Sequence, residues 1–256
     1  MLFLFPIILK YLPVNETSAG TNYLKEPSKI VYASNVFEED LQTKETVNTE
    51  ASALLYFTHN QEAYAPITKA VDGKVTVSHH TENITKFGDK LKGQLDSKGV
   101  QTTILPVDNT VVRNEKGMSF AQSYASIRPH VAEEVKTNPY DLIIDLHRDS
   151  IGKKYTTAVH EGTSYAKVAF VIGMEHANYQ SNEEKAVSLQ QQMEKIVPGI
   201  TRNIIRKSGS GVDGKYNQDL HPNLIVVELG GVENTEEELN RTIAVLAEAI
   251  PMILAK

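Results

Sequence analysis

The sequence contains no cysteine. Disulfide bonds, thiolate metal sites and a cysteine nucleophile are therefore excluded, and any metal ion must be held by His, Asp or Glu. A surplus of basic residues is also absent, because the formal net charge of the 256-residue chain is -6. Such a chain offers no broad cationic surface to nucleic acid or anionic lipid, so neither is expected as a partner.

Long apolar runs are scarce as well. Residues 1–14 are apolar, but this stretch is shorter than the roughly 20 residues that a membrane-spanning helix needs, and it has no basic leader. We interpret it as an imperfect export signal or a trimmed membrane anchor, which predicts a protein outside the cytoplasm, at the cell membrane or cell wall. Residues 15–50 are polar and aperiodic, which is typical of a linker. Residues 51–256 are then expected to form the folded domain.

Short apolar runs alternate with amphipathic segments through residues 51–256. Strands are predicted at residues 53–57, 100–105, 142–146, 166–172 and 224–227, and helices at residues 83–95, 120–135 and 182–197. A last helix is predicted after Thr235, because Thr235 and Glu238 have the spacing of a capping box. Strands that form continuous apolar runs and alternate with helices predict an α/β fold, with a mostly parallel sheet and helices on both faces.

Polar side chains directly follow three of these strands. His59 follows the first predicted strand, His147 the third and Glu228 the last. In open α/β sheets, functional groups gather beyond the carboxyl ends of the strands, so these side chains are expected to converge. A single histidine at a strand end is usually structural, but three such placements in one chain favour a functional site.

The expected site has the composition of a zinc centre. Zinc in a hydrolase takes about three protein ligands and leaves one position for a water that loses a proton near neutral pH. His59 and His147 suit two of the ligand positions. The third ligand is Glu62, since His-x-x-Glu on a turn brings both groups to one side, or else His79 or His80. Spacing alone does not choose among these three.

Glu228 has the position of a general base, which takes a proton from the activated water and delivers it to the leaving nitrogen. Arg148 and Asp149, which directly follow His147, have two interpretations. Either Arg148 orients the substrate and Asp149 orients His147, or the two residues form an internal ion pair.

Six segments of the chain carry a wider resemblance. They are residues 58–64, 83–88, 145–150, 170–173, 216–220 and 227–235. In this order they resemble the stage II sporulation protein P family, and six ordered segments are far more specific than one short motif. That family is similar, more distantly, to zinc-dependent N-acetylmuramoyl-L-alanine amidases, which cleave the bond between the lactyl group of the glycan and the stem peptide.

The resemblance implies a zinc amidase-like fold, a Zn2+ cofactor, a peptidoglycan substrate and a role in sporulation. It also implies membrane attachment with the domain outside, a second capacity to cut peptide cross-links, and a partner enzyme that cleaves the glycan. By this resemblance His59 and His147 hold the metal and Glu228 is the catalytic carboxylate. Asn217 and Gln218 are assigned to the substrate cleft in the same way.

The third metal ligand of the related amidases is a carboxylate four residues before an asparagine, which Asn83 matches here. That position holds His79, and imidazole is an equally good zinc donor. His79 is therefore the expected third ligand, with Glu62 and His80 as alternatives.

Two other functions fit the same residues. A zinc carboxypeptidase uses two histidines and two carboxylates in the order found here. It would also need a cation for the terminal carboxylate of its substrate, for which Arg128, Arg148 and Arg202 are candidates. A non-catalytic wall-binding module would keep the fold and would still bind peptidoglycan without the Glu228 carboxylate.

Overall fold

The computed structural model describes residues 51–255. The signal or anchor predicted at residues 1–14 and the linker predicted at residues 15–50 lie outside this part and stay predictions. Within the described part, no helix combines the length and the apolar character that crossing a bilayer requires.

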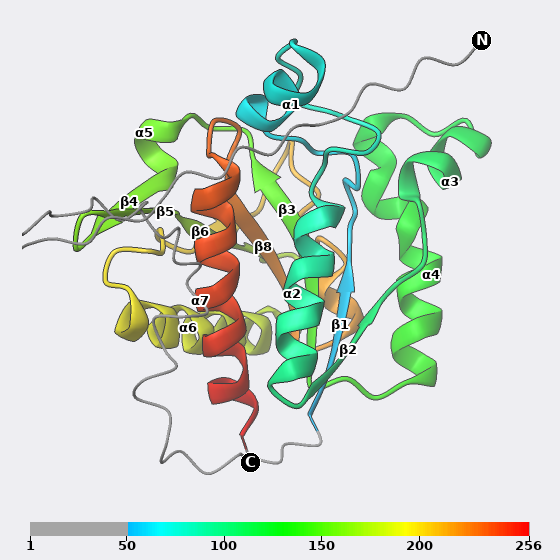
Figure 1. Ribbon diagram of the computed structural model, residues 1–256. Coiled ribbons are helices and arrows are strands. Elements are labelled where there is room, and N and C mark those ends of the chain that lie inside the picture. The colour runs from blue at the N-terminus through cyan, green and yellow to red at the C-terminus, as the bar shows by residue number, and fades with distance from the viewer. Residues whose placement is uncertain (1–50, 256) are drawn as a thin grey trace, which may run out of the picture. The chain divides into compact units, whose positions relative to one another are not determined.

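A six-stranded sheet lies at the centre of the described residues (Figure 1). Its strands are β1 (Ala51–Tyr56), β2 (Val100–Ile104), β3 (Leu142–Asp149), β6 (Val168–Gly173), β7 (Ile205–Lys207) and β8 (Leu224–Gly231). Their order across the sheet is β2-β1-β3-β8-β6-β7. All neighbouring strands are parallel except β6 and β8, which are antiparallel. The prediction of a mostly parallel sheet is confirmed.

Helices cover both faces of this sheet. The longest are α2 (Thr85–Ser97), α4 (Ser123–Thr137), α6 (Tyr179–Ile196) and α7 (Glu236–Leu254). Leu55 of β1 belongs to a large apolar cluster with residues of α2, α6 and α7, whereas Leu54 belongs to a smaller cluster with residues of α4. Because successive side chains of a strand point to opposite faces, the two clusters lie on the two sides of the sheet. The predicted α/β architecture is therefore confirmed.

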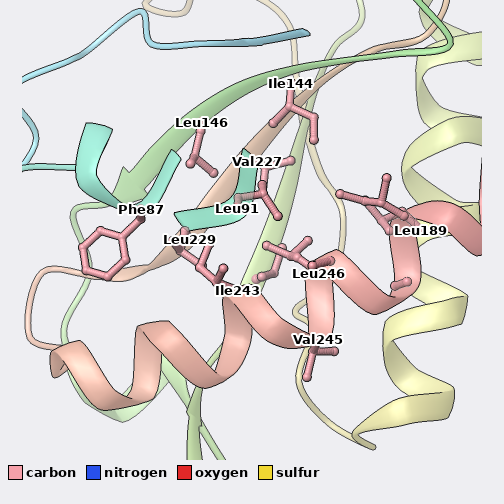
Figure 2. Packing of buried hydrophobic residues seen from close by; sticks show 14 of the residues in the cluster. Phe87, Leu91, Ile144, Leu146, Leu189, Val227, Leu229, Ile243, Val245 and Leu246 are labelled. Carbon is pink, nitrogen blue, oxygen red and sulfur yellow. The ribbon is translucent and has the colours of Figure 1, made fainter. Parts of the chain in front are cut away.

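In the larger cluster, the middle of the sheet packs against three helices (Figure 2). Leu91 of α2, Leu189 of α6 and Leu246 of α7 pack in it together with Leu146 of β3 and Val227 of β8, and all five are fully buried. Burying an aliphatic side chain of this size stabilises a fold by about 1.5–3 kcal/mol. The cluster thus anchors the two strands that carry the candidate site.

The remaining elements are short. They are α1 (Ala65–Asp72), α3 (Asn109–Glu115), α5 (Lys153–Thr156), the 3-10 helices η2 (Phe120–Gln122) and η3 (Gln218–Leu220), and an antiparallel hairpin of β4 (Thr157–His160) and β5 (Thr163–Ala166). At the start of α7, the Thr235 hydroxyl accepts a hydrogen bond from the Glu238 amide, and the Glu238 carboxylate accepts one from the Thr235 amide. The predicted capping box is confirmed.

Strands β3 and β8 extend further than the sequence predicts. His147 and Glu228 were expected just beyond the strand ends, but both lie inside paired strands, which run to Asp149 and Gly231. The reason is that the β3–β8 ladder continues past His147, with a bulge between His147 and Asp149. The polar residues are therefore held by the sheet itself.

Candidate functional site

His147 and Glu228 face the same side of the sheet. They are register partners in the parallel β3–β8 pair, and side chains at paired positions on adjacent strands project together. The His147 side chain is almost completely buried, and Oε2 of Glu228 is buried without a hydrogen-bond partner in the described residues. The sheet thus sets an imidazole beside a carboxylate oxygen that is free to interact.

The turn after β1 brings His59 and Glu62 to His147. A hydrogen bond of 3.0 Å from the Glu62 amide to the His59 carbonyl closes this turn. The ring centroids of His59 and His147 are 5.2 Å apart, with the rings nearly perpendicular. Oε2 of Glu62 lies 3.7 Å from Nδ1 of His147 and accepts a hydrogen bond from the Arg148 amide at 2.8 Å. The turn therefore places one imidazole and one carboxylate close to His147.

Asp145 is a site residue that the sequence reasoning missed. Its carboxylate accepts hydrogen bonds from the Thr58 amide (2.9 Å) and the Thr58 hydroxyl (2.6 Å). Its Oδ1 also lies 3.0 Å from Nε2 of His147, and the hydroxyl of Tyr124 lies 3.4 Å from the same nitrogen. The signal was present, since a carboxylate inside an apolar strand is rare unless it is paired.

The His79 ring has its partners outside this group. Nε2 of His79 lies 2.8 Å from the Asp72 carboxylate, and its Nδ1 accepts a hydrogen bond from the Glu82 amide, also at 2.8 Å. Both ring nitrogens are thus engaged, one by the last residue of α1 and one by a backbone amide of the following loop. His80 is exposed, and no hydrogen bond or ion pair of its ring is found in residues 51–255.

Arg148 and Asp149 do not form the internal ion pair that was one of their two interpretations. The Asp149 carboxylate binds Arg202 instead, at 2.5 Å. Arg148 donates from its guanidinium to the carbonyls of Asp149 and Val77. The carboxylate that contacts His147 is Asp145, two residues before it, and not Asp149.

Asn217 and Gln218 are buried, and both are engaged within the protein. Asn217 adopts a left-handed backbone conformation, accepts a hydrogen bond from Arg128 and donates one to the Tyr124 carbonyl. The Gln218 amide bridges the backbone of β6, where it accepts from the Gly173 amide and donates to the Val171 carbonyl. Gln218 therefore has its amide groups occupied by the sheet.

Burial and charge shift the pKa values of the site. Burial, followed by the charge of His147, lowers the pKa of His59 to about 3, so this imidazole is neutral and keeps a lone pair. Burial alone would lower the pKa of His147, but the carboxylates of Asp145, Glu62 and Glu228 raise it to about 10. Burial raises the pKa of Glu228 to about 7. Three carboxylates thus surround one imidazole, and a bound cation would replace the proton that His147 otherwise carries.

The donor types are those that zinc takes, but no group of three His, Cys, Asp or Glu side chains in residues 51–255 is placed closely enough to hold a metal ion. Two ligands of a tetrahedral zinc, each about 2.1 Å from it, are about 3.4 Å apart. The 3.7 Å between His147 Nδ1 and Glu62 Oε2 is close to this separation. Two imidazoles and one carboxylate are also a donor set of catalytic zinc sites, which suits the neutral His59.

A pocket of about 290 Å³ opens beside these donors, and we call it the His59 pocket. Its walls include His59, Glu62, Arg113, Phe120 and Arg148. The Phe120 ring stacks on the His59 ring, with 4.5 Å between their centroids. A substrate that occupies this pocket would touch His59 and Glu62, whereas His147 and Glu228 are not among the residues that line it.

Comparison with known families gives a match along nearly the whole chain. The profile of stage II sporulation protein P matches residues 13–251. The chain belongs to the stage II sporulation protein P family. Stage II sporulation protein P of Bacillus subtilis (strain 168) is 35% identical over 243 residues, which cover 87% of this chain and 61% of that protein. The chain therefore spans less than two thirds of the length of this relative.

The chain also matches solved structures of other proteins, with low TM-scores and low sequence identity. Murine aminoacylase 3 gives a TM-score of 0.44 at 12% identity, covering 82% of this chain and 66% of that one. A candidate N-acetylmuramoyl-L-alanine amidase from Neisseria meningitidis gives a TM-score of 0.41 at 10% identity, covering 80% of this chain and 96% of that one. Membership of the stage II sporulation protein P family rests on the sequence matches.

Proposed function

We propose that this chain is a zinc-dependent peptidoglycan hydrolase, which cleaves the amide between the muramyl lactyl group and the stem peptide. Membership of the stage II sporulation protein P family supports a role at the cell wall during sporulation. The observation that carries the proposal is the meeting of His59, Glu62 and His147 on the side of the sheet that Glu228 also faces. This group contains the metal donors and the base that hydrolysis of an amide requires.

His59, Glu62 and His147 are the residues proposed to hold zinc. The separations of 5.2 Å between the two rings and 3.7 Å between Glu62 and His147 support this set. Glu62 takes the place first expected for His79, because both ring nitrogens of His79 are engaged by Asp72 and by backbone amides. His80 is the weaker alternative, since it is exposed.

Glu228 is proposed as the general base and acid. A bound zinc would supply Lewis acidity toward the attacking water and the amide carbonyl. The Glu228 carboxylate accepts the proton that the water loses and donates it to the leaving nitrogen as the C–N bond breaks, which yields a free lactyl carboxylate and a free peptide amine. A pKa near 7 suits both transfers at neutral pH.

Asp145 is proposed as the residue that orients His147. A carboxylate bonded to the second nitrogen of a metal-binding imidazole fixes the ring and makes it a stronger donor. The 3.0 Å contact between Asp145 and Nε2 of His147 supports this role, and it leaves Nδ1 on the side of Glu62.

Two further properties belong to the proposal. The first is a location outside the cell membrane, at the membrane or the wall, where peptidoglycan is accessible. The second is cleavage of peptide cross-links as an additional activity, with a partner enzyme that cuts the glycan once stem peptides are removed.

A zinc carboxypeptidase acting on wall peptides is the second candidate function. The order His59-x-x-Glu62, His147 and Glu228 supports it, and so does Arg148, which lines the His59 pocket. The other two cations first considered for the terminal carboxylate are less suited, because Arg128 pairs with Asp219 and Arg202 with Asp149.

Mass spectrometry of digested peptidoglycan tests the proposal. The wild-type protein, loaded with zinc, should release free stem peptides, whereas His147→Ala and Glu228→Gln should release none. Release of single terminal amino acids would favour the carboxypeptidase instead. Split cross-links on peptides still joined to the glycan would make the endopeptidase the main activity. Binding without any product from the wild type would indicate a wall-binding module and end the hydrolase proposal.

A further inference from the structure

The His59 pocket contains two arginines and a single carboxylate, that of Glu62. Arg148 lies on β3, and Arg113 lies in the last turn of α3. Arg113 has no part in the reaction proposed above. The reaction proposed above therefore does not account for the positive charge of this pocket.

Arg148 is a buried cation whose guanidinium forms no ion pair with a carboxylate in residues 51–255. Its exposure is 8%, and its guanidinium donates to two neutral groups, the carbonyls of Asp149 and Val77. Its Nε is buried without a hydrogen-bond partner in the described residues. The arginine ion pairs of residues 51–255 are made by Arg128, Arg202 and Arg206, and none includes Arg148. A buried guanidinium in this state gains stability when an anion binds beside it.

Arg113 is a second cation without a carboxylate partner among the described residues. Its guanidinium carbon lies 5.5 Å from the centroid of the Phe120 ring, which in turn stacks on His59. The contact with Phe120 holds the guanidinium at the pocket wall without neutralising its charge. The capping box between Ser119 and Gln122 fixes the short helix that carries Phe120.

We propose that Arg113 and Arg148 bind a free carboxylate of the wall peptide and so make the enzyme specific for acidic stem peptides. This inference rests on the proposed function, because it names what the same site recognises. Arginine suits the role since its planar fork matches the two oxygens of a carboxylate. The Glu62 carboxylate can balance at most one of the two guanidinium charges, and its hydrogen bond comes from the Arg148 backbone amide. Arg113 is the specificity-determining residue of this pair.

Three wall fragments of nearly equal size test the proposal. They are N-acetylmuramoyl-L-alanyl-D-glutamate, its D-isoglutamine form with one carboxyl amidated, and the diamide with both carboxyls amidated. Their affinities are measured by titration calorimetry on the zinc-loaded full chain, with Glu228→Gln present throughout so that no fragment is cut. Arg113→Gln and Arg113→Lys are compared with Lys116→Gln, which removes an exposed charge from the end of the same helix.

The acid should bind about tenfold or more tightly than the diamide, as expected for a charge-assisted hydrogen bond. Arg113→Gln should abolish most of this preference, Arg113→Lys should retain part of it, and Lys116→Gln should leave it unchanged. The D-isoglutamine form identifies which of the two carboxyls is recognised.

Equal affinity for acid and diamide, or a preference that survives Arg113→Gln, overturns the carboxylate site. Release of stem peptides by the protein with intact Glu228 is scored separately. If peptides are released without any preference, the carboxylate site alone is wrong. If the preference is present and no peptides are released, the reaction is wrong and the carboxylate site stands.

Discussion

The carboxylate of Asp145 lies 3.0 Å from Nε2 of His147, and the two side chains are 0% and 3% exposed. The same carboxylate accepts two hydrogen bonds from Thr58, in the segment that leads into His59. One buried carboxylate therefore connects the strand that carries one candidate ligand with the turn that carries another. Because of this connection, we expect removal of the Asp145 charge to lower zinc affinity strongly.

Asp145→Asn should lower the affinity for zinc by about 10- to 100-fold, as is typical when the outer partner of a metal-binding histidine is lost. The measurement is competition for zinc against a chelator of known affinity. Asp89→Asn serves as the control, because Asp89 is an exposed carboxylate on α2. If Asp145→Asn binds zinc as tightly as this control, Asp145 does not support the metal ligands.

Glu62→Gln and His79→Ala separate the two candidates for the third ligand. Glu62→Gln should lose bound zinc, because an amide oxygen is a much poorer zinc ligand than a carboxylate. His79→Ala should keep one zinc per chain, because the His79 ring is engaged by Asp72. Elemental analysis after dialysis gives the metal content, and the opposite result for the two variants would restore the assignment of His79.

Gln218→Leu should lower the stability of the fold. It should have no separate effect on substrate binding. It leaves the Gly173 amide and the Val171 carbonyl of β6 without their side-chain partner, at a cost of about 2–4 kcal/mol. The free energy of unfolding in denaturant measures this loss, with Gln191→Leu on the exposed side of α6 as the control. Unchanged stability with weakened peptidoglycan binding would return Gln218 to the substrate cleft.

Asp219→Asn should destabilise the protein in a pH-dependent way. The hydrogen bonds from Arg128 hold the pKa of Asp219 below its usual value. A lowered carboxyl pKa contributes stability above the unfolded value of about 3.9, and this contribution is lost as the pH falls through the folded value. Because Arg128 is partly exposed, we expect a loss of about 0.5–1 kcal/mol at pH 7.

The comparison of wild type and Asp219→Asn at several pH values provides the measurement. The difference in unfolding free energy should shrink as the pH falls below about 4. A difference that stays constant from pH 7 to acid pH would mean that the ion pair with Arg128 does not stabilise the fold.

The central strands could be predicted from the sequence because they are buried on both faces. Leu54 and Leu55 face different apolar clusters, so the strand appears as one continuous apolar run. Strand β7 could not be predicted, because its three residues Ile205–Lys207 form no such run. It lies at the edge of the sheet. Short elements such as α1 and α3 lack the length that a helical period needs to be visible.

The meeting of His59, His147 and Glu228 could be anticipated because parallel strands end at one edge of a sheet. The partners of these residues could not. Asp145 lies within an apolar run, and its contact with Thr58 spans 87 positions of the chain. The position of the His79 side chain depends on its contact with Asp72. The sequence does not show which of its neighbours this histidine contacts.

The two halves of the site differ in how they are supported. His147 and Glu228 are register partners on two adjacent strands that are buried among α2, α6 and α7, so their spacing changes only if the centre of the protein opens. His59 and Glu62 lie outside the β3–β8 ladder, on a turn that is held by hydrogen bonds from Thr58 to Asp145 and between Glu62 and His59. If the proposed metal binds, we therefore expect any change in the geometry of the site to occur in residues 58–62 and not in the paired strands.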